Sequence, residues 1–368
     1  MDRDALAEQL ALIDCPGIGP VRYRAIHQAL GGRLGELFRL GTTELAALGL
    51  KPDQIEALHN PDASRLDAAL EWLESSPDHY LIGLDDPLYP PLLRELHDAP
   101  PLLHARGRIE LLPRAQLAVV GSRNCTPGGA RSARDFSAEL ARHGLVITSG
   151  MALGIDAEAH AGALDAGGGS IAVIGTGIDR IYPSRNKALA HRLAEEGLIV
   201  SEFPLGTPPN SENFPRRNRV ISGLSRATLV VEATRRSGSL ITARCSIEQG
   251  RDVFALPGSI HNPQAKGCHQ LIREGAKLVE EVAHILDELS AWLEAPSPIE
   301  PNPGPTVEDS SLEREYRKLL DQMGYDPVSL DELAARSGLT VAELSSMLLR
   351  LELTDLIQSL PGGLFQRC

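Results

Sequence analysis

The chain has 368 residues, 42% of them hydrophobic, with 34 Gly and 26 Pro. This length suits two or three domains with a sizeable core. The N-terminus mixes acidic with apolar residues, and no stretch approaches about 18 uninterrupted apolar residues, so we expect neither a secretory signal nor a membrane span. The five cysteines are scattered without a C-x-x-C pair, which fits reduced thiols in a cytoplasm and predicts neither a disulfide frame nor a zinc site.

The formal net charge of −13 argues, taken alone, against a protein that binds nucleic acid. Affinity for phosphates, however, depends on the local field rather than on the total charge. Residues 211–251 contain eight Arg, three Glu and no Lys or Asp, a local net charge of +5. Ordinary surface variation is one explanation. We favour an anion-binding region, because arginine binds phosphate through two parallel hydrogen bonds.

The first part of the chain, residues 1–75, shows apolar residues at helical spacing, which predicts a small domain of short helices. A Pro-Gly-Ile-Gly stretch at 16–19 forms a tight turn between two of them, because proline fixes φ and glycine tolerates positive φ. Such a turn is typical of a helix-hairpin-helix, whose amides hold a DNA phosphate. It is equally typical of a plain turn in a helical bundle, and the sequence leaves both interpretations open.

From about residue 115 the pattern changes to short apolar runs that alternate with amphipathic helices. Runs of this kind predict a parallel sheet covered on both faces, here a doubly wound, Rossmann-like α/β core over 80–290. The runs are Leu117–Val120, Leu145–Thr148, Ile171–Ile174, Leu198–Val200, Leu229–Val231 and Val253–Leu256.

The last part of the chain begins with five prolines between 295 and 305, which predict a stiff linker over 295–310. Residues 311–368 then contain two helical stretches and a Pro-Gly-Gly turn, the order of elements in a winged helix. The second helical stretch carries Glu343 and Glu352 but only Arg350 as a base. That is a poor composition for reading a DNA major groove, so we favour a protein-contact or structural role.

Glycine-containing loops follow several of the predicted strands, at 121–129, 149–154, 175–177 and 237–239. Ligands of open α/β sheets bind beyond the carboxyl ends of the strands, and amides at helix starts attract anions. The four loops therefore predict a ligand with several phosphates, although glycine also simply permits tight turns. None of them matches a dinucleotide or P-loop fingerprint, so we expect no cofactor.

The strongest local constellation is Phe-Pro-Arg-Arg-Asn-Arg at 214–219. Three guanidinium groups within four residues repel one another unless an anion or an acidic partner lies among them. In a helix, Arg216 and Arg219 share one face. An aromatic ring beside arginines suits single-stranded nucleic acid, since the ring stacks on any base while the cations bind phosphates. The alternative places Phe214 in the core and pairs the arginines with acids.

Asp156 and His160 are four residues apart on one predicted helix and would suit a general-base pair. We favour instead a structural hydrogen bond that fixes the preceding loop. His261, Cys268 and His269 have a spacing that suits no common metal site, so we expect no bound metal.

Between about 80 and 280 the chain resembles the DNA-processing protein A (DprA/Smf) family. The matching stretches include DDPLYPPLL, VVGSRNCT, SGMALGIDAEAH, AVIGTGIDRIYP, FPRRNRVISGLS and VVEATRRSGSLITAR, and their occurrence together and in this order is highly specific. The two ends resemble the family more loosely, as a helical domain of the sterile-alpha-motif or helix-hairpin type and a winged helix.

The resemblance implies a homodimer that binds single-stranded DNA and loads the RecA recombinase onto it during natural transformation, without catalysing a reaction. The DNA pocket that it implies has Lys266 at its edge and contains Ser122, Arg123, Gly150, Gly154, Phe214, Arg216, Arg217, Asn218 and Arg219.

An enzyme is the main alternative, namely a phosphoribohydrolase-like protein of the Rossmann type that releases a base from a nucleotide. Such enzymes carry P-G-G-x-G-T-x-x-E, and the equivalent stretch at 237–244 lacks the paired glycines and the catalytic acid. A sensor of a small nucleotide is a further alternative, which tight binding of a mononucleotide without DNA would indicate.

Overall fold

The computed structural model describes residues 3–290, 314–354, 356–360 and 362–367. The chain divides into two compact units, residues 1–297 and 298–368. The predicted linker at 295–310 lies outside the described residues, and the predicted boundary between a helical domain at 1–75 and a core at 80–290 stays a prediction. Within the described residues, no helix is long and apolar enough to cross a membrane.

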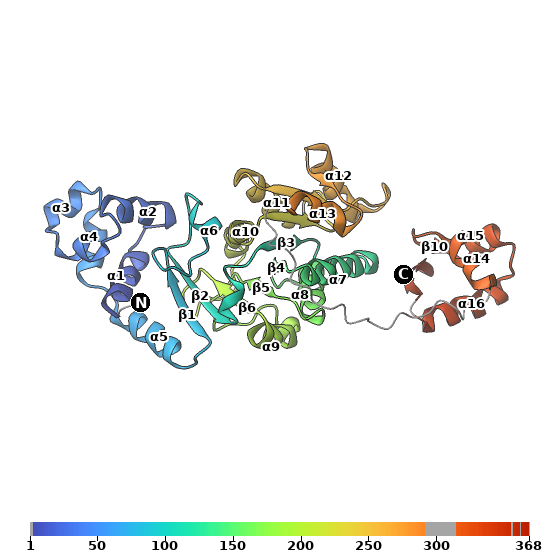
Figure 1. Ribbon diagram of the computed structural model, residues 1–368, viewed down its shortest axis with the longest axis horizontal. Coiled ribbons are helices and arrows are strands. Elements are labelled where there is room, and N and C mark those ends of the chain that lie inside the picture. The colour runs from blue at the N-terminus through green and yellow to red at the C-terminus, as the bar shows by residue number, and fades with distance from the viewer. Residues whose placement is uncertain (1–2, 291–313, 355, 361, 368) are drawn as a thin grey trace. The chain divides into compact units, whose positions relative to one another are not determined.

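The first unit is built on one nine-stranded sheet with the order β1-β2-β6-β5-β4-β3-β7-β8-β9 (Figure 1). β1 and β2 run antiparallel to their neighbours, and all other pairs are parallel. The strands are β1 (His79–Gly83), β2 (Leu102–Gly107), β3 (Gln116–Val120), β4 (Val146–Ser149), β5 (Ser170–Val173), β6 (Leu198–Ser201), β7 (Ala227–Val230), β8 (Asp252–Ala255) and β9 (Lys277–Leu278). The doubly wound, Rossmann-like α/β prediction is confirmed, and each of the six predicted runs overlaps one strand from β3 to β8.

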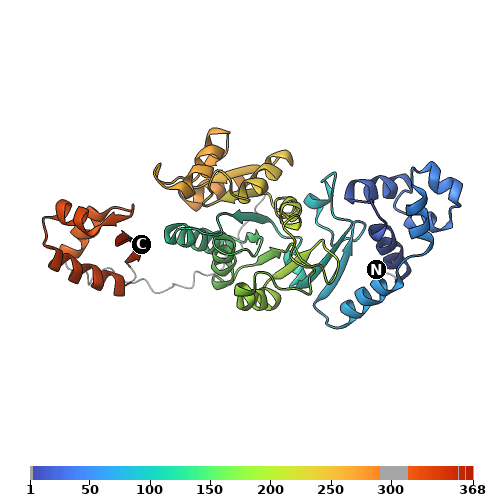
Figure 2. The ribbon, with the colours of Figure 1, turned by 180° about the vertical axis from the view of Figure 1, so that it is seen from behind.

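The strands read as continuous apolar runs because both faces of the sheet are covered. In β3, Leu117 and Val119 pack into one core, whereas Ala118 and Val120 pack into the core on the other face. The first core includes side chains of α7 (Pro127–Arg142), α8 (Ile155–Asp165) and α13 (Val282–Leu289). The second includes α10 (Asn213–Leu224), α11 (Ser239–Glu248) and α12 (Lys266–Arg273), and Figure 2 shows the same layers from behind.

The order of the strands reverses between β3 and β7. The chain proceeds from β3 through β4 and β5 to β6 on one side, and then returns to place β7 against the other side of β3. Connections that leave two neighbouring strands in opposite directions open a crevice beyond their carboxyl ends. The fold therefore offers one preferred place for a ligand, at the ends of β3 and β7.

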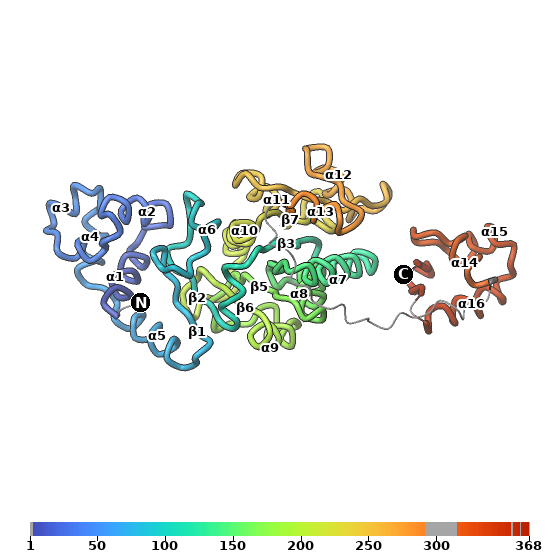
Figure 3. Tube along the Cα trace, in the orientation of Figure 1, coloured from blue at the N-terminus to red at the C-terminus, as the bar shows by residue number. Residues whose placement is uncertain are grey.

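Short helices precede the sheet, and the tube in Figure 3 follows them into β1. They are α1 (Arg3–Asp14), α2 (Pro20–Ala29), a 3-10 turn (Leu34–Arg39), α3 (Thr42–Ala47), α4 (Pro52–His59) and α5 (Ala63–Glu74), and α6 (Pro91–Arg94) follows β1. The Pro-Gly-Ile-Gly turn joins α1 to α2, and the Gln54 side chain of α4 donates a 2.7 Å hydrogen bond to the Pro16 carbonyl. The turn is thus braced inside the bundle, and its proposed contact with a phosphate stays a prediction.

The second unit has the predicted winged-helix arrangement. Its helices are α14 (Arg314–Met323), α15 (Leu330–Ser337) and α16 (Val341–Leu353), and β10 (Val328–Ser329), β11 (Ile357–Leu360) and β12 (Leu364–Arg367) form a sheet of order β10-β12-β11. Thr340 and Glu343 cap α16 reciprocally, which fixes where this helix begins. The unit has a core of its own, built around Leu333, Leu344 and Leu348.

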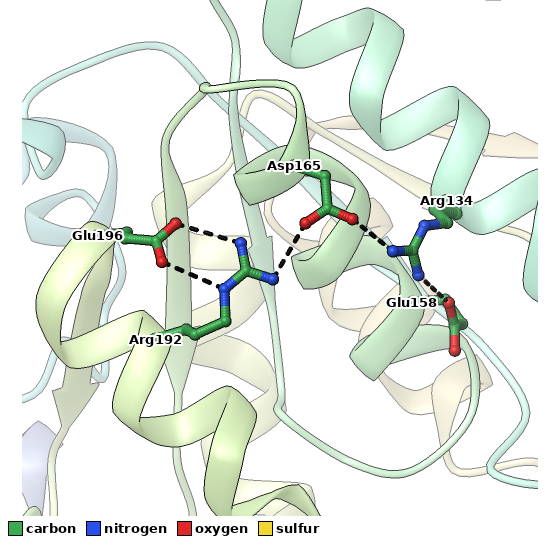
Figure 4. A network of polar contacts seen from close by, with 5 residues as sticks. All are labelled: Arg134, Glu158, Asp165, Arg192 and Glu196. Atoms are coloured by element: carbon green, nitrogen blue, oxygen red, sulfur yellow. Dashed lines mark hydrogen bonds and ion pairs between the residues drawn. The ribbon is translucent and has the colours of Figure 1, made fainter.

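A chain of ion pairs joins three helices on one face of the first unit (Figure 4). Asp165 of α8 is its centre, because it pairs with Arg134 of α7 and, at 3.0 Å, with Arg192 of α9 (Lys187–Glu196). Glu158 and Glu196 extend the chain at its two ends, at 3.0 and 3.2 Å. The participating side chains are 36–47% exposed, so solvent screens each pair strongly.

We expect Asp165→Asn to lower the free energy of unfolding by about 0.5–1 kcal/mol, since two half-exposed pairs are lost at once. The difference in the free energy of unfolding between the variant and the wild type should shrink at high salt, because salt screens the ion pairs of the wild type. Thermal unfolding at low and high salt measures it, with Asp135→Asn on α7 as the matched control, because Asp135 is exposed and has no ion pair in the described part of the chain. Equal effects of the two substitutions would mean that the network contributes nothing.

Candidate functional site

A cavity of about 710 Å³ opens where the strand order reverses. Its walls come from the loop after β3, the loop after β4, the start of α10 and the loop between β7 and α11. Five of the ten sequence-predicted DNA contacts line it, and these are Ser122, Arg123, Phe214, Arg217 and Asn218. The fold thus brings residues from distant parts of the chain to one crevice.

Two further predicted residues, Gly150 and Gly154, lie immediately behind the cavity wall. A Cβ atom on Gly154 would lie 2.4 Å from the Ser122 carbonyl oxygen, and its φ of +76° also disfavours any side chain. A Cβ atom on Gly150 would lie 2.7 Å from the Arg217 guanidinium. Glycine at both places therefore allows the loops after β3 and β4 to pack against each other and against α10.

The remaining predicted residues, Arg216, Arg219 and Lys266, do not line the cavity. Arg219 pairs with Glu202 at 2.5 Å and with Asp98 at 3.2 Å, which is the arrangement that the alternative interpretation of this segment expected. The Arg216 guanidinium lies 5.5 Å from the centre of the Phe203 ring, and the Lys266 amine donates to the Ile260 carbonyl.

The mouth of the cavity combines two aromatic rings with a cation. The Arg123 guanidinium lies 5.6 Å from the centre of the Phe214 ring, and Tyr182 lies on the same ring with 5.5 Å between centres and a tilt of 31°. Arg123 is exposed and has no ion pair among the described residues. Tyr182 was missed by sequence reasoning, although an aromatic residue in the loop after the third core strand was an available signal.

Beneath the mouth, Arg217 is a buried cation that joins the ends of two strands. Its guanidinium donates to the Gly150 carbonyl at 2.7 Å and to the Val173 carbonyl, while its Nε donates to the Asn218 side chain at 3.2 Å. Burial lowers the pKa of Arg217 to about 10, and the nearby Asp156 carboxylate opposes that shift. The group therefore stays charged at neutral pH.

Asp156 and His160 hold the loop after β4 through its backbone. One Asp156 oxygen accepts hydrogen bonds from the amides of Gly150 and Ala152, at 3.1 and 3.3 Å. His160 Nε2 accepts from the Met151 amide, while its Nδ1 bonds to the Ser170 hydroxyl at 2.7 Å. Burial lowers the pKa of His160 to about 3, so the ring is neutral. These contacts confirm the structural hydrogen bonding that the sequence favoured.

The wall opposite the aromatic mouth is made of hydroxyl groups at the start of α11. Ser237, Ser239 and Thr242 line it, and the first two share a 2.7 Å hydrogen bond. The amides of Ser239, Leu240 and Ile241 already have partners within this loop and helix start, so the hydroxyl groups are the donors that face the cavity. The loop at 237–239 therefore lines the cavity, and its binding of an anion stays a prediction.

The helix start after β3 differs from its prediction as an anion site. The Glu232 carboxylate accepts hydrogen bonds from the Thr126 amide at 2.8 Å and from the Thr126 hydroxyl at 2.6 Å. A carboxylate of the protein thus already satisfies the amide and hydroxyl of Thr126, the N-cap residue of α7, and places a negative charge at the positive end of the helix dipole. The sequence did not show this, because Glu232 follows a strand more than 100 residues later.

The lining of the cavity contains few groups that can transfer a proton. Asp156 is the only acidic residue among the described residues that line the cavity, and no His or Cys joins it there. No group of three potential metal ligands lies together in the described parts of the chain. Fold and site define an α/β protein whose cavity at the switch point of the sheet is lined by arginines, hydroxyl groups and aromatic rings, followed in the chain by a winged helix.

The comparisons with known proteins identify this class more closely. The family model described as DNA recombination-mediator protein A matches residues 80–290, and that of the DprA winged helix domain matches residues 302–363. The chain belongs to the DNA recombination-mediator protein A family, as the resemblance in its motifs indicated.

Curated relatives share most of the chain. Protein Smf of Escherichia coli K12 is 46% identical over 323 residues, which cover 87% of this chain and 85% of that protein. DNA processing protein DprA of Streptococcus pneumoniae R6 is 50% identical over 205 residues, or 56% of this chain and 72% of the relative.

Two solved structures share the fold. DNA processing protein A of Streptococcus pneumoniae matches with a TM-score of 0.66 and 36% identity, over 77% of this chain and 96% of that one. DNA processing protein A of Helicobacter pylori matches with a TM-score of 0.52 and 29% identity, over 56% of this chain and 94% of that one. The Helicobacter pylori protein is described as having a unique single-stranded DNA binding mode.

We expect the free energy of unfolding to fall as the pH drops below 6.5, because His160 must stay neutral in the fold. Its folded pKa of about 3 lies below the unfolded value of 6.5. Its contribution is therefore complete above pH 6.5 and is lost as the pH falls towards 3, by about 1.4 kcal/mol per pH unit.

Chemical unfolding from pH 7 to pH 4 tests this in the wild type and in His160→Gln, which keeps an acceptor for the Met151 amide but cannot titrate. The buried His104, with a pKa lowered to about 4, contributes equally to both proteins and cancels in the difference. Parallel pH profiles would show that His160 is not protonated selectively in the unfolded state.

Proposed function

We propose that the chain binds single-stranded DNA in the switch-point cavity. The observation that carries this proposal is the mouth of the cavity, where Arg123, which has no ion pair within the described part of the chain, lies over Phe214 beside the half-exposed Tyr182. Aromatic faces stack on unpaired bases, whereas the bases of a duplex are already stacked on one another. The binding mode described for the Helicobacter pylori relative supports the same ligand class.

The other predicted contacts take different parts in this proposal. Gly150 and Gly154 shape the wall, and Arg217 fixes α10 beneath it while adding positive charge. Arg216, which is exposed, and Lys266 contact phosphates of the strand where it leaves the cavity. Ser122 and Asn218 hydrogen-bond the strand within the cavity, and Arg219 anchors α10 through its acids.

We further propose that the bound strand is delivered to the RecA recombinase during natural transformation, by a cytoplasmic homodimer. The description of the family as a recombination mediator supports the recombinase. The dimer, the cytoplasmic location and transformation rest on the resemblance of the motifs.

We infer that the protein acts without catalysis. Releasing a base from a nucleotide needs a positioned acid or base. The one carboxylate at the cavity, on Asp156, is buried and engaged by two backbone amides. Incubation with nucleoside monophosphates should therefore release no free base, and base release that disappears in Asp156→Asn would overturn this inference.

Arg123→Ala and Phe214→Ala should each weaken binding of an oligo-dT strand by about 1–3 kcal/mol, through loss of a charge-assisted hydrogen bond and of base stacking. Their salt dependence should differ. Removing Arg123 should flatten the plot of log affinity against log salt, because fewer counterions are released, whereas removing Phe214 should leave the slope unchanged.

Fluorescence anisotropy over a salt series measures both quantities, with duplex DNA in parallel, which should bind more weakly. Arg142→Ala at the far end of α7 is the control, since this arginine is exposed and outside the cavity wall. If neither cavity variant changes affinity, the DNA site lies elsewhere, and the turn at 16–19 is the next place to test.

Delivery to the recombinase should appear as a shorter lag before RecA hydrolyses ATP on DNA coated with single-strand-binding protein. The full chain should shorten the lag, and Arg123→Ala should restore it in proportion to the loss of DNA affinity. An unchanged lag with intact DNA binding would contradict the proposed delivery to RecA but would not contradict the proposed binding of single-stranded DNA.

A further inference from the structure

The second unit leaves one face of its longest described helix uncovered. In α16, Leu344, Leu348 and Leu351 are buried in the core of the unit. The opposite face consists of Ala342, Ser346, Leu349 and Leu353, which recur three or four residues apart and so lie on one side of the helix. Leu349 is 58% exposed and Leu353 is 78% exposed. Two leucines in one stripe suit a protein interface better than water.

This face is unsuited to nucleic acid, although α16 occupies the position of a recognition helix. Its four residues are uncharged, and Glu343 and Glu352 flank it with Arg350 as the one base on the helix. Contact with DNA needs cations to neutralise phosphates. The occupant of the face is therefore a protein surface.

We propose that the occupant is α16 of a second copy of this chain, packed antiparallel across a twofold axis that passes between residues 347 and 348. In that register Ala342 lies opposite Leu353 of the second copy, and Ser346 lies opposite Leu349 of the second copy. Each exposed leucine thus meets a small residue, the alternation of large and small that lets two helices approach closely. The contact is isologous, as in most homodimers.

The charges beside the stripe agree with this register. Glu343 and Arg350 lie on the same flank of α16, seven residues apart, and the twofold axis places Glu343 of each copy beside Arg350 of the other. The Arg350 guanidinium is held on that flank, 5.2 Å from the centre of the Tyr316 ring. Glu352 is on the other flank, where it accepts hydrogen bonds from the Ser359 amide and hydroxyl, at 3.1 and 2.6 Å.

A thiol crosslink in the full-length protein detects this contact between two α16 helices. It does so even if two copies of the chain also associate through another surface. Ser346→Cys lies close to the proposed axis, so a short bis-maleimide should join two copies about tenfold faster than with Ala335→Cys, an exposed position of α15. The wild type, with its native cysteines, gives the background rate. Adding Leu349→Glu should reduce the rate to that of the Ala335→Cys control.

The charge pair supplies a second test that separates self-association from loss of folding. Arg350→Glu on the Ser346→Cys chain should slow the crosslink, because it sets two acidic side chains beside each other across the twofold axis, while the cap formed by Thr340 and Glu343 stays intact. Circular dichroism checks that each variant is folded. Equal rates for the two cysteine positions, or a rate unchanged by Leu349→Glu or by Arg350→Glu, would overturn the proposal. So would a loss of duplex DNA binding in Arg350→Glu, which would make α16 a nucleic-acid contact.

Discussion

The buried charge of Arg217 is the constraint on which the site depends. Burying a charged guanidinium away from water costs several kcal/mol of folding free energy unless polar partners surround it. Around Arg217 these partners are carbonyl groups at the ends of β4 and β5 and the Asp156 carboxylate. Those partners belong to the sheet and to the loop that Asp156 and His160 hold in place. The position of α10 along the strand ends follows from them, and with it the position of Phe214, less than one turn earlier.

The arginines of this region divide into internal and external groups. Arg219 is tethered to Asp98 and Glu202, and Arg251 donates to the carbonyls of Gly223, Ser225 and Leu92, all at 2.6–2.7 Å. Such arginines organise the backbone between α6, α10 and β8 and contribute little to the field outside. The local net charge of +5 in residues 211–251 therefore overstates what a ligand meets, and the exposed Arg123, from outside that segment, matters more than the count suggested.

The sheet and the winged helix were predictable because their signals are local. A buried parallel strand must be apolar on both faces, and β3 to β8 show this within four or five residues each. Glycine-rich loops at their ends likewise marked the crevice. Which arginines are tethered inside the protein and which are exposed was not predictable from the sequence. Asp98 and Glu202 are distant from Arg219 in the sequence, and only the fold brings them together. The same holds for Glu232 at the start of α7 and for Tyr182 beside Phe214.

Binding of a polyanion by an acidic protein, as we propose for this chain, presents an electrostatic conflict, which screening resolves. At physiological salt the field of an exposed charge decays over about 8 Å, so most of the acids behind the net charge of −13 are not felt inside the cavity. What remains there is the charge of Arg123 and Arg217, opposed by the single carboxylate of Asp156. As salt is lowered, counterion release from the DNA strengthens binding, but the repulsion from distant acids also reaches further. The two trends oppose each other, so we expect stacking on Phe214 and Tyr182 to carry a larger share of the proposed selectivity than it would in a basic protein.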